Sequence, residues 1–247
     1  MRRIKLKVAY DGTNYAGWQI QKNALTIEEI LNKTISKLTE EDIAIIGASR
    51  TDSGVHALGN ICVFDTNSKI AAEKFSFALN TKLPEDIVIV SSEEVDVTWH
   101  PRYQHNIIKS YEYRIFNGKF PNPLRNRYTT FVSFNLDVEK MKEAAKYIIG
   151  EHDFKSFCNI RTNAKTTVRT VTELSIEKEE NEIVLRISGN GFLYNMVRII
   201  AGTLIRVGRG FYEPEQVKEI IESRRRNAAG VTVPPNGLTL LKIEYPN

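Results

Sequence analysis

The sequence contains few residues of the kinds that build disulfide frameworks and metal sites. Its two cysteines, Cys62 and Cys158, lie far apart and in no CxxC pattern, and its four histidines are scattered. This spacing excludes the usual zinc-binding templates and leaves no disulfide framework to predict. A chain so poor in cysteine suits a reducing compartment, and we expect no bound metal.

Long apolar runs are also missing. No stretch approaches the roughly 20 apolar residues that a membrane-spanning helix needs. Met1-Arg2-Arg3 leads directly into an alternating strand pattern, not into the apolar core of a signal peptide. The sequence has neither a P-loop nor a dinucleotide-binding fingerprint. We therefore expect a cytoplasmic protein with no membrane span.

The charge balance is slightly basic. Lysine and arginine total 34 residues against 30 of aspartate and glutamate, which gives a formal net charge of +4. This excess is compatible with a polyanionic partner but does not require one, because many globular proteins carry as much. Apolar residues make up 42% of the 247 residues, so the chain can bury a substantial core.

The first half of the chain alternates between strand and helix patterns. Apolar residues alternate over 4–10 and stop at the turn pair Asp11-Gly12, which predicts a half-buried strand. Thr26 and Glu29 form a capping-box pattern before a helical apolar stripe. The short apolar run over 43–48 predicts a central strand. Further strands are expected over 58–64 and 87–90, and a helix over 71–80.

A second set of patterns begins near residue 109. It predicts strands over 109–116, 168–176, 183–188 and 238–245, and helices over 138–149, 192–207 and after Pro214. The two entry strands end in similar turns, Asp11-Gly12 and Asn117-Gly118, which is a weak sign of an internal repeat. We expect an α+β fold of two similar halves, 1–105 and 106–247, with mainly antiparallel strands forming a continuous sheet flanked by helices.

Asp52 is the candidate reactive group. It follows the predicted central strand in a loop that contains Gly54, a place where a scaffold can hold an exposed side chain still. A guanidinium from Arg50 would keep the carboxylate ionised, and an ionised carboxylate can act as nucleophile or base. The alternative is a turn-capping aspartate with Arg50 as a surface partner. On these residues alone the structural alternative is favoured.

Several strings resemble motifs of the tRNA pseudouridine synthase A family and occur in the family's order. The string that resembles the signature loop is Arg50-Thr51-Asp52-Ser53-Gly54-Val55-His56-Ala57. Other strings similar to family motifs are Tyr10-Asp11-Gly12-Thr13-Asn14-Tyr15-Ala16-Gly17-Trp18-Gln19, Trp99-His100-Pro101-Arg102, Lys109-Ser110-Tyr111-Glu112-Tyr113, Gly191-Phe192-Leu193-Tyr194-Asn195-Met196-Val197-Arg198, and Ala228-Ala229-Gly230 through Gly237-Leu238. The resemblance spans nearly the whole chain and implies the pseudouridine synthase fold.

The resemblance implies a role for each matching residue. Asp52 would be the essential carboxylate, in the N-terminal half, and the C-terminal half would complete the active-site cleft. Arg50 would pair with Asp52 and help to displace a base from its stack. Tyr111 would stack on the target uracil. Arg198 would place a cation near Asp52, and Leu240 would supply apolar packing beside the pocket.

Structural interpretations stand beside these roles. Tyr111 has Tyr113 in phase, so both could be plain core aromatics, and Arg198 could extend from an apolar helix to water. The resemblance gives His56 no catalytic role, so we interpret it as structural or close to RNA. Two further sets are expected to have structural or solvent-facing roles. Tyr15 and Trp18 would serve packing or loop ordering, and Arg224-Arg225-Arg226 would be a basic helix end.

The sequence departs from the family pattern at a few positions. Ser49 stands where the family usually has glycine, Pro101 replaces an alanine, and Gln104-His105-Asn106 replaces small residues. The change at Ser49 affects the backbone geometry of the loop and leaves the reacting group, the Asp52 carboxylate, intact. The changes at Pro101 and after it concern contacts with the substrate.

The implied reaction is the isomerisation of uridine to pseudouridine in the anticodon stem-loop of tRNA, at positions 38, 39 and 40, by a homodimer. It needs no metal and no cofactor. Asp52 would either attack C1′ or remove the C2′ proton, and the sequence does not choose between these routes. Two other classes stay open. A noncatalytic RNA-binding module would leave Asp52 idle, and a glycoside or nucleoside hydrolase would usually need a second carboxylate.

Overall fold

The computed structural model describes residues 1–159 and 164–245, and the chain divides into two compact units. Residues 1–107 and the final segment from Leu240 form the first unit, and Ile108–Thr239 forms the second. The sequence-based division at 105/106 placed everything after it in one half. That expectation was wrong for the final segment, which contributes a strand to the first unit.

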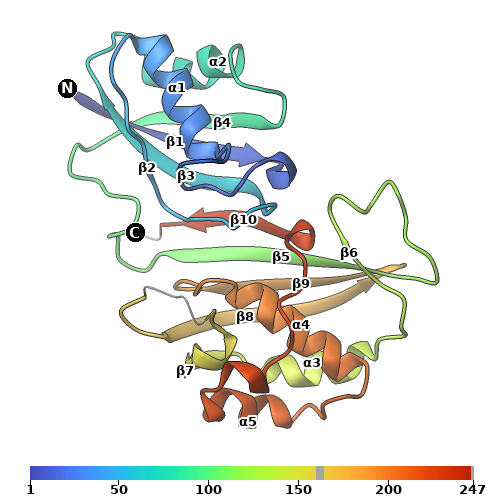
Figure 1. Cartoon of the computed structure of the whole chain (residues 1–247). Helices are drawn as coiled ribbons and strands as arrows, with labels where there is room; N and C mark the ends of the chain where they lie inside the picture. Colours follow the sequence, from blue (N-terminus) through green and yellow to red (C-terminus); the bar gives the residue numbers. More distant parts are fainter. Residues whose placement is uncertain (160–163, 246–247) are drawn as a thin grey trace. The chain divides into compact units, whose positions relative to one another are not determined.

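The first unit is built on an antiparallel sheet. Its strands are β1 (Arg2–Tyr10), β2 (Ile46–Gly47), β3 (His56–Thr66), β4 (Ile87–Val95) and the part of β10 (Leu238–Glu244) that begins at Leu240. The order is β4-β1-β3-β10, and β1 pairs antiparallel with both of its neighbours. The helices α1 (Ile27–Thr39) and α2 (Phe75–Asn80) cover one face of this sheet (Figure 1). The 3₁₀ turns are η1 (Gly12–Asn14) and η2 (Ala72–Lys74).

The start of α1 follows the predicted capping pattern. The Thr26 side chain accepts a hydrogen bond from the backbone N–H of Glu29 at 3.4 Å, which satisfies one of the free donors of the first turn. The buried side of the helix consists of Ile27, Leu31 and Ile35, a spacing of four that places them on one face. The predicted helix is therefore confirmed, with its apolar stripe against the sheet.

The run over 43–48 does not form the central strand that we expected. Only Ile46–Gly47 is strand, and it pairs with β3 off the main strand order. The reason is that side chains of α1 take the backbone donors: Ile43 N–H donates to Ser36 Oγ and Ile45 N–H to Asn32 Oδ1, both at 3.0 Å. The side chains of Ile43 and Ile45 are buried. The apolar run therefore predicted the burial correctly, but the strand is shorter than the run predicted.

The second unit is built on another largely antiparallel sheet. Its strands are β5 (Ile108–Asn117), β6 (Thr130–Val132), β7 (Gly150–Asp153), β8 (Val168–Glu179) and β9 (Glu182–Gly189). The order is β5-β9-β8-β7, all antiparallel, with β6 parallel to β5. The strands predicted over 168–176 and 183–188 are confirmed and pair as a hairpin, whose turn is Glu180-Asn181, with Glu180 at a φ of 53°. The α+β class with mainly antiparallel strands is thus confirmed.

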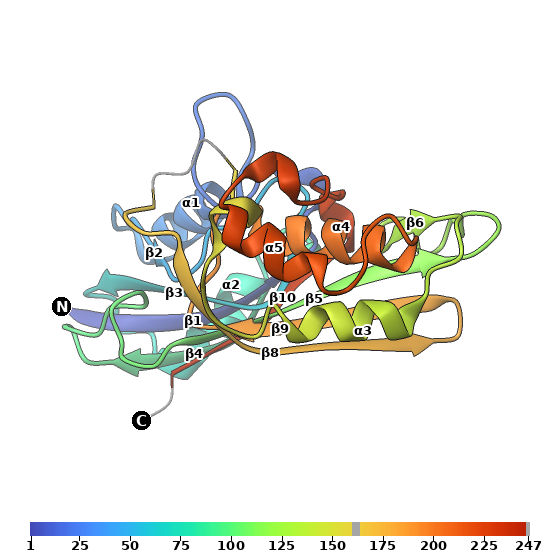
Figure 2. The same cartoon turned by 90° about the horizontal axis from the view of Figure 1, so that it is seen from below.

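Three helices cover one face of this sheet, α3 (Val138–Lys146), α4 (Met196–Gly208) and α5 (Gln216–Ser223) (Figure 2). The 3₁₀ turns are η3 (Phe154–Phe157), η4 (Arg226–Ala228) and η5 (Pro235–Gly237). The helix expected from residue 192 begins only at Met196. Asn195 has a left-handed φ of 63°, which is not a helical conformation, so the residues before Met196 do not continue the helix. Within the described residues, none of the helices is both long and apolar enough to cross a membrane.

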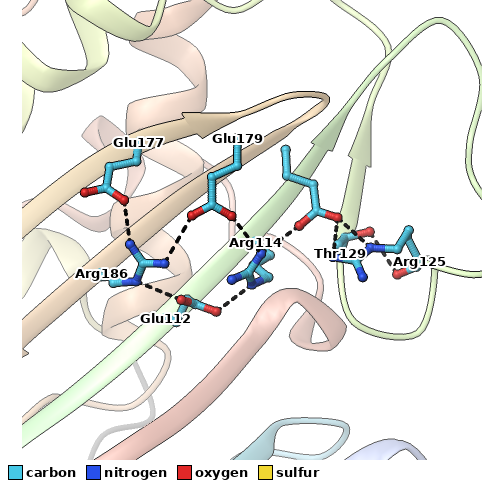
Figure 3. Close-up of polar contacts among 8 residues, drawn as sticks. Glu112, Arg114, Arg125, Thr129, Glu177, Glu179 and Arg186 are labelled. Carbon is cyan, nitrogen blue, oxygen red and sulfur yellow. Dashed lines mark hydrogen bonds and ion pairs between the residues drawn. The ribbon is translucent and has the colours of Figure 1, made fainter.

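The other face of the second sheet carries a network of charges (Figure 3). Glu112 on β5 accepts from Arg114 Nε at 2.6 Å and from Arg186 Nε at 2.9 Å. Glu182 accepts from Arg114 and Arg125. Glu177 and Glu179 form ion pairs with Nη1 and Nη2 of Arg186. The half-buried Arg114 and Arg186 therefore each have carboxylate partners, which is the usual condition for a cation withdrawn from water.

Candidate active site

Asp52 lies at the first position of a tight turn. The backbone N–H of Val55 donates to the carbonyl oxygen of Asp52 at 3.1 Å, and Gly54 has a φ of 77°. A positive φ at the third position is what a type II turn requires, and glycine adopts it without steric cost. The Asp52 side chain is half-buried, between the buried Thr51 and the exposed Ser53.

A side chain of β1 fixes Thr51, the residue before Asp52. The hydroxyl oxygen of Tyr10 lies 2.8 Å from Oγ1 of Thr51, and both side chains are buried. The backbone N–H of Trp18 donates to the Thr51 carbonyl at 3.1 Å. Asn60 on β3, with no exposed surface, donates to the Ser49 carbonyl at 3.0 Å. Ser49 therefore stands in a fixed backbone, although the family usually has glycine there.

The segment 12–18 wraps the other side of the turn. The carbonyl oxygen of Tyr15 accepts from Gly54 N–H and from the Ser53 hydroxyl, each at 3.2 Å. Two glycines allow the close approach: a Cβ at Gly12 would lie 2.0 Å from the Val55 carbonyl oxygen, and one at Gly17 would lie 2.5 Å from that of Thr51. The resemblance at 10–19 and the loop at 50–57 are thus two sides of one packed structure.

His56 connects these segments and is buried. The backbone N–H of Gly12 lies 3.1 Å from His56 Nδ1 and can donate to it. Asp11 Oδ1 also lies 3.1 Å from Nδ1. Of the two interpretations considered for His56, the buried position supports the structural one.

Tyr15 anchors the wrapping segment to the rest of the first unit. Its hydroxyl donates to Asp86 Oδ1 at 2.5 Å, and the Asp11 backbone N–H donates to the Asp86 carbonyl at 3.0 Å. Burial and then the bond to Asp86 raise the pKa of the Tyr15 hydroxyl above its usual value. Tyr15 and Trp18 are only 5% and 1% exposed, so their expected role in packing and loop ordering is confirmed.

Arg50 lies on the same loop with an exposed side chain. An exposed guanidinium keeps its hydration, so an ion pair with a neighbour at the surface gains little free energy. The expected pairing of Arg50 with Asp52 stays a prediction.

The Trp99-His100-Pro101-Arg102 element supports the first unit near β2. Nε of Arg102 donates to the Gly47 carbonyl at 2.6 Å. Trp99 packs edge-on against Tyr245, with ring centroids 5.0 Å apart, and the Tyr245 hydroxyl donates to the Pro101 carbonyl at 3.0 Å. Proline has its carbonyl available like any other residue, so the change at Pro101 keeps this contact.

Tyr111 and Arg198 belong to the second unit. Tyr111 on β5 is 7% exposed and packs edge-on against Phe192, with ring centroids 5.2 Å apart. Arg198 lies in the first turn of α4 and is half-buried; its Nε donates to the Val233 carbonyl at 2.8 Å and its Nη1 to Asn195 Oδ1 at 3.0 Å. Arg198 is thus fixed by polar contacts and does not simply extend to water.

Leu240 is fully buried on β10. The supports that sequence reasoning missed are the Tyr10 hydroxyl and Asn60. The alternating strand pattern and the motif string at 10–19 both contain Tyr10, but neither predicts that its hydroxyl contacts Thr51. A signal for Asn60 was present, because an asparagine inside the apolar run of β3 must find hydrogen-bond partners. What the first unit provides chemically is one half-buried carboxylate on a loop held from two sides, which suits a nucleophile or a base.

Comparison with known proteins gives consistent matches. The sequence matches the family described as tRNA pseudouridine synthase over residues 7–104 and 144–246. Proteins named tRNA pseudouridine synthase A from Thermoanaerobacter sp. strain X514 and Acetivibrio thermocellus are each 50% identical over 245 residues, covering 99% of this chain and 100% of the relative. A protein of Clostridium perfringens named tRNA pseudouridine synthase A 2 is 51% identical with the same coverage.

Similarity to solved structures is more distant. A Cbf5-Nop10-Gar1 complex has a TM-score of 0.37 and 12% identity, covering 94% of this chain and 47% of that chain. At this distance the likeness carries no inference about the site, so the full-length sequence matches are the informative ones.

Proposed function

The chain belongs to the tRNA pseudouridine synthase family, and from this premise we propose that Asp52 is its reacting carboxylate and that its targets are uridines 38, 39 and 40 of the anticodon stem-loop. The protein is an isomerase that acts on uridine in tRNA. The observation that carries the assignment of Asp52 is its turn, held by Tyr10 and Trp18 through Thr51 and by Tyr15 through Gly54.

The reaction changes the uracil atom that is bonded to C1′ of the ribose from N1 to C5. In one route an Asp52 oxygen bonds to C1′ as the N1–C1′ bond breaks, and the ester is displaced when C5 attacks C1′. In the other route Asp52 removes the C2′ proton while the uracil leaves, and the proton returns after C5 has bonded. Both routes end with loss of the C5 proton, protonation of N1 and a regenerated carboxylate. Both need a single held carboxylate, which is what the loop supplies.

Four other residues are proposed to bind the substrate. Tyr111 stacks on the uracil once the base has left the helix stack, a step that costs a few kcal/mol. Arg50, whose side chain is exposed, contacts the RNA and helps to displace the base. Arg198 supplies a cation that its bonds to Val233 and Asn195 hold in place. Leu240 supplies apolar packing beside the base.

The wider setting is proposed on the same premise. The partner is tRNA, and the slight excess of basic residues agrees with a polyanionic substrate. The working form is a homodimer in the cytoplasm. Sedimentation equilibrium of the purified protein tests the oligomeric state, and a single species of 28.2 kDa at assay concentrations would contradict the dimer.

The test is base-resolved pseudouridine mapping of unmodified tRNA transcripts after incubation with the protein. We expect pseudouridine at positions 38–40 with the wild type and none with Asp52→Ala or Asp52→Asn, while tRNA binding and folding stay near normal. Asp42→Ala, which removes an exposed carboxylate, is the matched control and should retain activity. Full activity of the Asp52 variants would remove Asp52 from the chemistry. Release of free uracil would show hydrolysis, and modification elsewhere in tRNA would contradict the assigned positions.

A further inference from the structure

The four arginines of the first unit differ in what they contact. Arg2 and Arg3 each form an ion pair with a carboxylate, and Arg50 is already proposed to contact the RNA. The fourth, Arg102, has an exposed side chain, and among the residues that the structure describes no carboxylate pairs with it. The hydrogen bonds of Arg102 therefore decide where its charge is directed.

One hydrogen bond tethers the Arg102 side chain to the stretch that leads to Asp52. Nε of Arg102 donates to the Gly47 carbonyl at 2.6 Å. The hydrogen bonds described for this side chain use Nε alone, which leaves the outer edge of the guanidinium, Nη1 and Nη2, available. These two donors lie in one plane and match the spacing of two phosphate oxygens.

The turn that carries Arg102 is itself fixed. The Arg102 backbone N–H lies 3.1 Å from His100 Nδ1 and can donate to it, and the Gln104 side chain donates to the His100 carbonyl at 3.1 Å. Nη1 of Arg3 donates to the Trp99 carbonyl at 2.9 Å, which ties the turn to β1. Burial and then the charges of Arg102 and Arg3 lower the pKa of His100, so its imidazole is neutral at neutral pH. Arg102 is therefore the cation that this turn presents to solvent.

The carbonyl that anchors Arg102 lies close to Asp52 along the chain. Gly47 ends β2, and Asp52 follows five residues later, so their Cα atoms are at most about 18 Å apart. Trp18 packs directly on Gly47, where a Cβ would lie 2.5 Å from Trp18 Nε1, and the Trp18 backbone N–H donates to the Thr51 carbonyl. At a rise of about 3.4 Å per nucleotide, 18 Å corresponds to about five nucleotides. A phosphate near the reacting nucleotide is therefore within range of Arg102.

We propose that the outer edge of the Arg102 guanidinium binds a backbone phosphate of the tRNA near the target uridine, an inference that rests on the proposed function. The tether at Nε restricts the guanidinium before the RNA binds, so less side-chain freedom is lost on binding. Phosphate contacts position a nucleic acid without reading its sequence. Arg102 is thus a substrate-binding residue that sets the register of the strand on the Asp52 loop and takes no part in the chemistry.

Two substitutions separate the charge of Arg102 from its tether. In Arg102→Gln the side-chain amide nitrogen occupies the position of Nε, so the bond to Gly47 can be kept while the outer edge and its charge are lost. In Arg102→Lys the charge is kept, but a methylene replaces Nε and the tether is lost. Lys37→Gln, which removes an exposed cation on α1, is the matched control for net charge.

The experiment measures tRNA affinity against salt concentration in the Asp52→Ala background, so that turnover does not interfere. Arg102→Gln should weaken binding by about tenfold at low salt. It should also make the slope of log K against log salt shallower by about 0.7–0.9, the effect of one lost phosphate contact. Arg102→Lys should keep the original slope, and Lys37→Gln should keep both slope and affinity. With Asp52 intact, the single-turnover rate at saturating protein should be the same in Arg102→Gln as in the wild type.

An unchanged slope in Arg102→Gln would overturn the phosphate contact, and a lower melting temperature with that result would reduce Arg102 to a support of β2. An equal change of slope in Lys37→Gln would also overturn it, because the effect would then be one of net charge. A changed oligomeric state in Arg102→Gln, measured by sedimentation equilibrium, would assign the guanidinium to a protein carboxylate instead of RNA.

The two proposals fail in distinguishable ways. Absence of pseudouridine in the wild-type reaction contradicts the proposed function, whereas an unchanged salt slope contradicts only the phosphate contact. If Arg102→Gln does not fold, ethylation interference on the wild type decides the outcome. Ethylation of a phosphate within about five nucleotides of the target should then weaken binding, and the absence of any such phosphate would overturn the contact.

Discussion

The hydroxyl oxygen of Tyr10 lies 2.8 Å from Oγ1 of Thr51, one residue before Asp52. The bond is buried and joins β1 to the loop that carries the carboxylate. Asn60 Nδ2 lies 3.4 Å from the same hydroxyl and also donates to the Ser49 carbonyl. The loop is therefore fixed on both sides of Arg50 by side chains from two strands of one sheet.

Tyr10→Phe should impair turnover more than substrate binding. Loss of the hydroxyl leaves Thr51 without this bond, so Asp52 is held less firmly and kcat should fall by roughly tenfold with little change in KM. The free energy of unfolding should fall by about 1 kcal/mol. Steady-state kinetics on tRNA transcripts and denaturant unfolding measure the two effects. Tyr103→Phe, at a ring that is 78% exposed, is the control, and an equal effect there would contradict the positioning role.

Gly17→Ala should damage the site through a direct clash. Gly17 has a φ of 90°, and a Cβ there would lie 2.5 Å from the Thr51 carbonyl oxygen. Gly210→Ala is matched to it, because Gly210 has a φ of 74° but no atom within 4 Å of the added Cβ. Both should lose about 1–2 kcal/mol of stability from the left-handed backbone. Only Gly17→Ala should also lower kcat, by tenfold or more (an order-of-magnitude estimate). Comparable kcat values in the two variants would show that the close approach is unimportant.

Tyr111→Phe should retain activity, whereas Tyr111→Ala should lose most of it. The proposed role is stacking of the ring on the uracil, which is worth about 1–3 kcal/mol per base and does not use the hydroxyl. Single-turnover rates on tRNA transcripts distinguish the variants, with circular dichroism as the check on folding, since the ring is 7% exposed and packs on Phe192. Equal losses in the two variants would assign the role to the hydroxyl instead.

Asp65→Asn should lower stability at neutral pH but not in acid. Arg3 donates to both carboxylate oxygens of Asp65 at 2.7 Å, and this bond lowers the pKa of Asp65. A lowered folded-state pKa gives stability that is present above the unfolded pKa of about 3.9 and is lost as pH falls through the folded value. The wild type should therefore exceed the variant by about 1 kcal/mol at pH 5–8, and the difference should vanish in stronger acid.

Urea unfolding at a series of pH values measures this difference. Glu93→Gln breaks the more exposed contact with Lys5 on the same sheet and controls for the loss of one negative charge. A difference for Asp65→Asn that persists unchanged below pH 3 (roughly one unit under the ordinary aspartate value) would exclude the ionised pair as its source.

Local patterns were sufficient for most of the fold. Alternation predicted β1, local strand patterns predicted β3 and β5, and the Thr26 cap predicted the start of α1, because these features depend on neighbouring residues alone. The run over 43–48 shows the limit. Its apolar residues are buried as expected, but Ser36 and Asn32 on α1 take its backbone donors, and no local pattern contains that information.

The sequence by itself determined the family and the α+β class and indicated the loop that carries Asp52, because motif strings and periodicity are properties of the chain as written. Only the tertiary structure decided which groups hold that loop. Tyr10 and Trp18 contact Thr51 over 41 and 33 positions of sequence, and Asn60 contacts Ser49 over 11. Such contacts exist only after the sheet has formed. It also decided that Arg50 faces solvent, and that Arg226 turns inward while Arg225 does not, since burial depends on the packing around a residue and not on its neighbours in sequence.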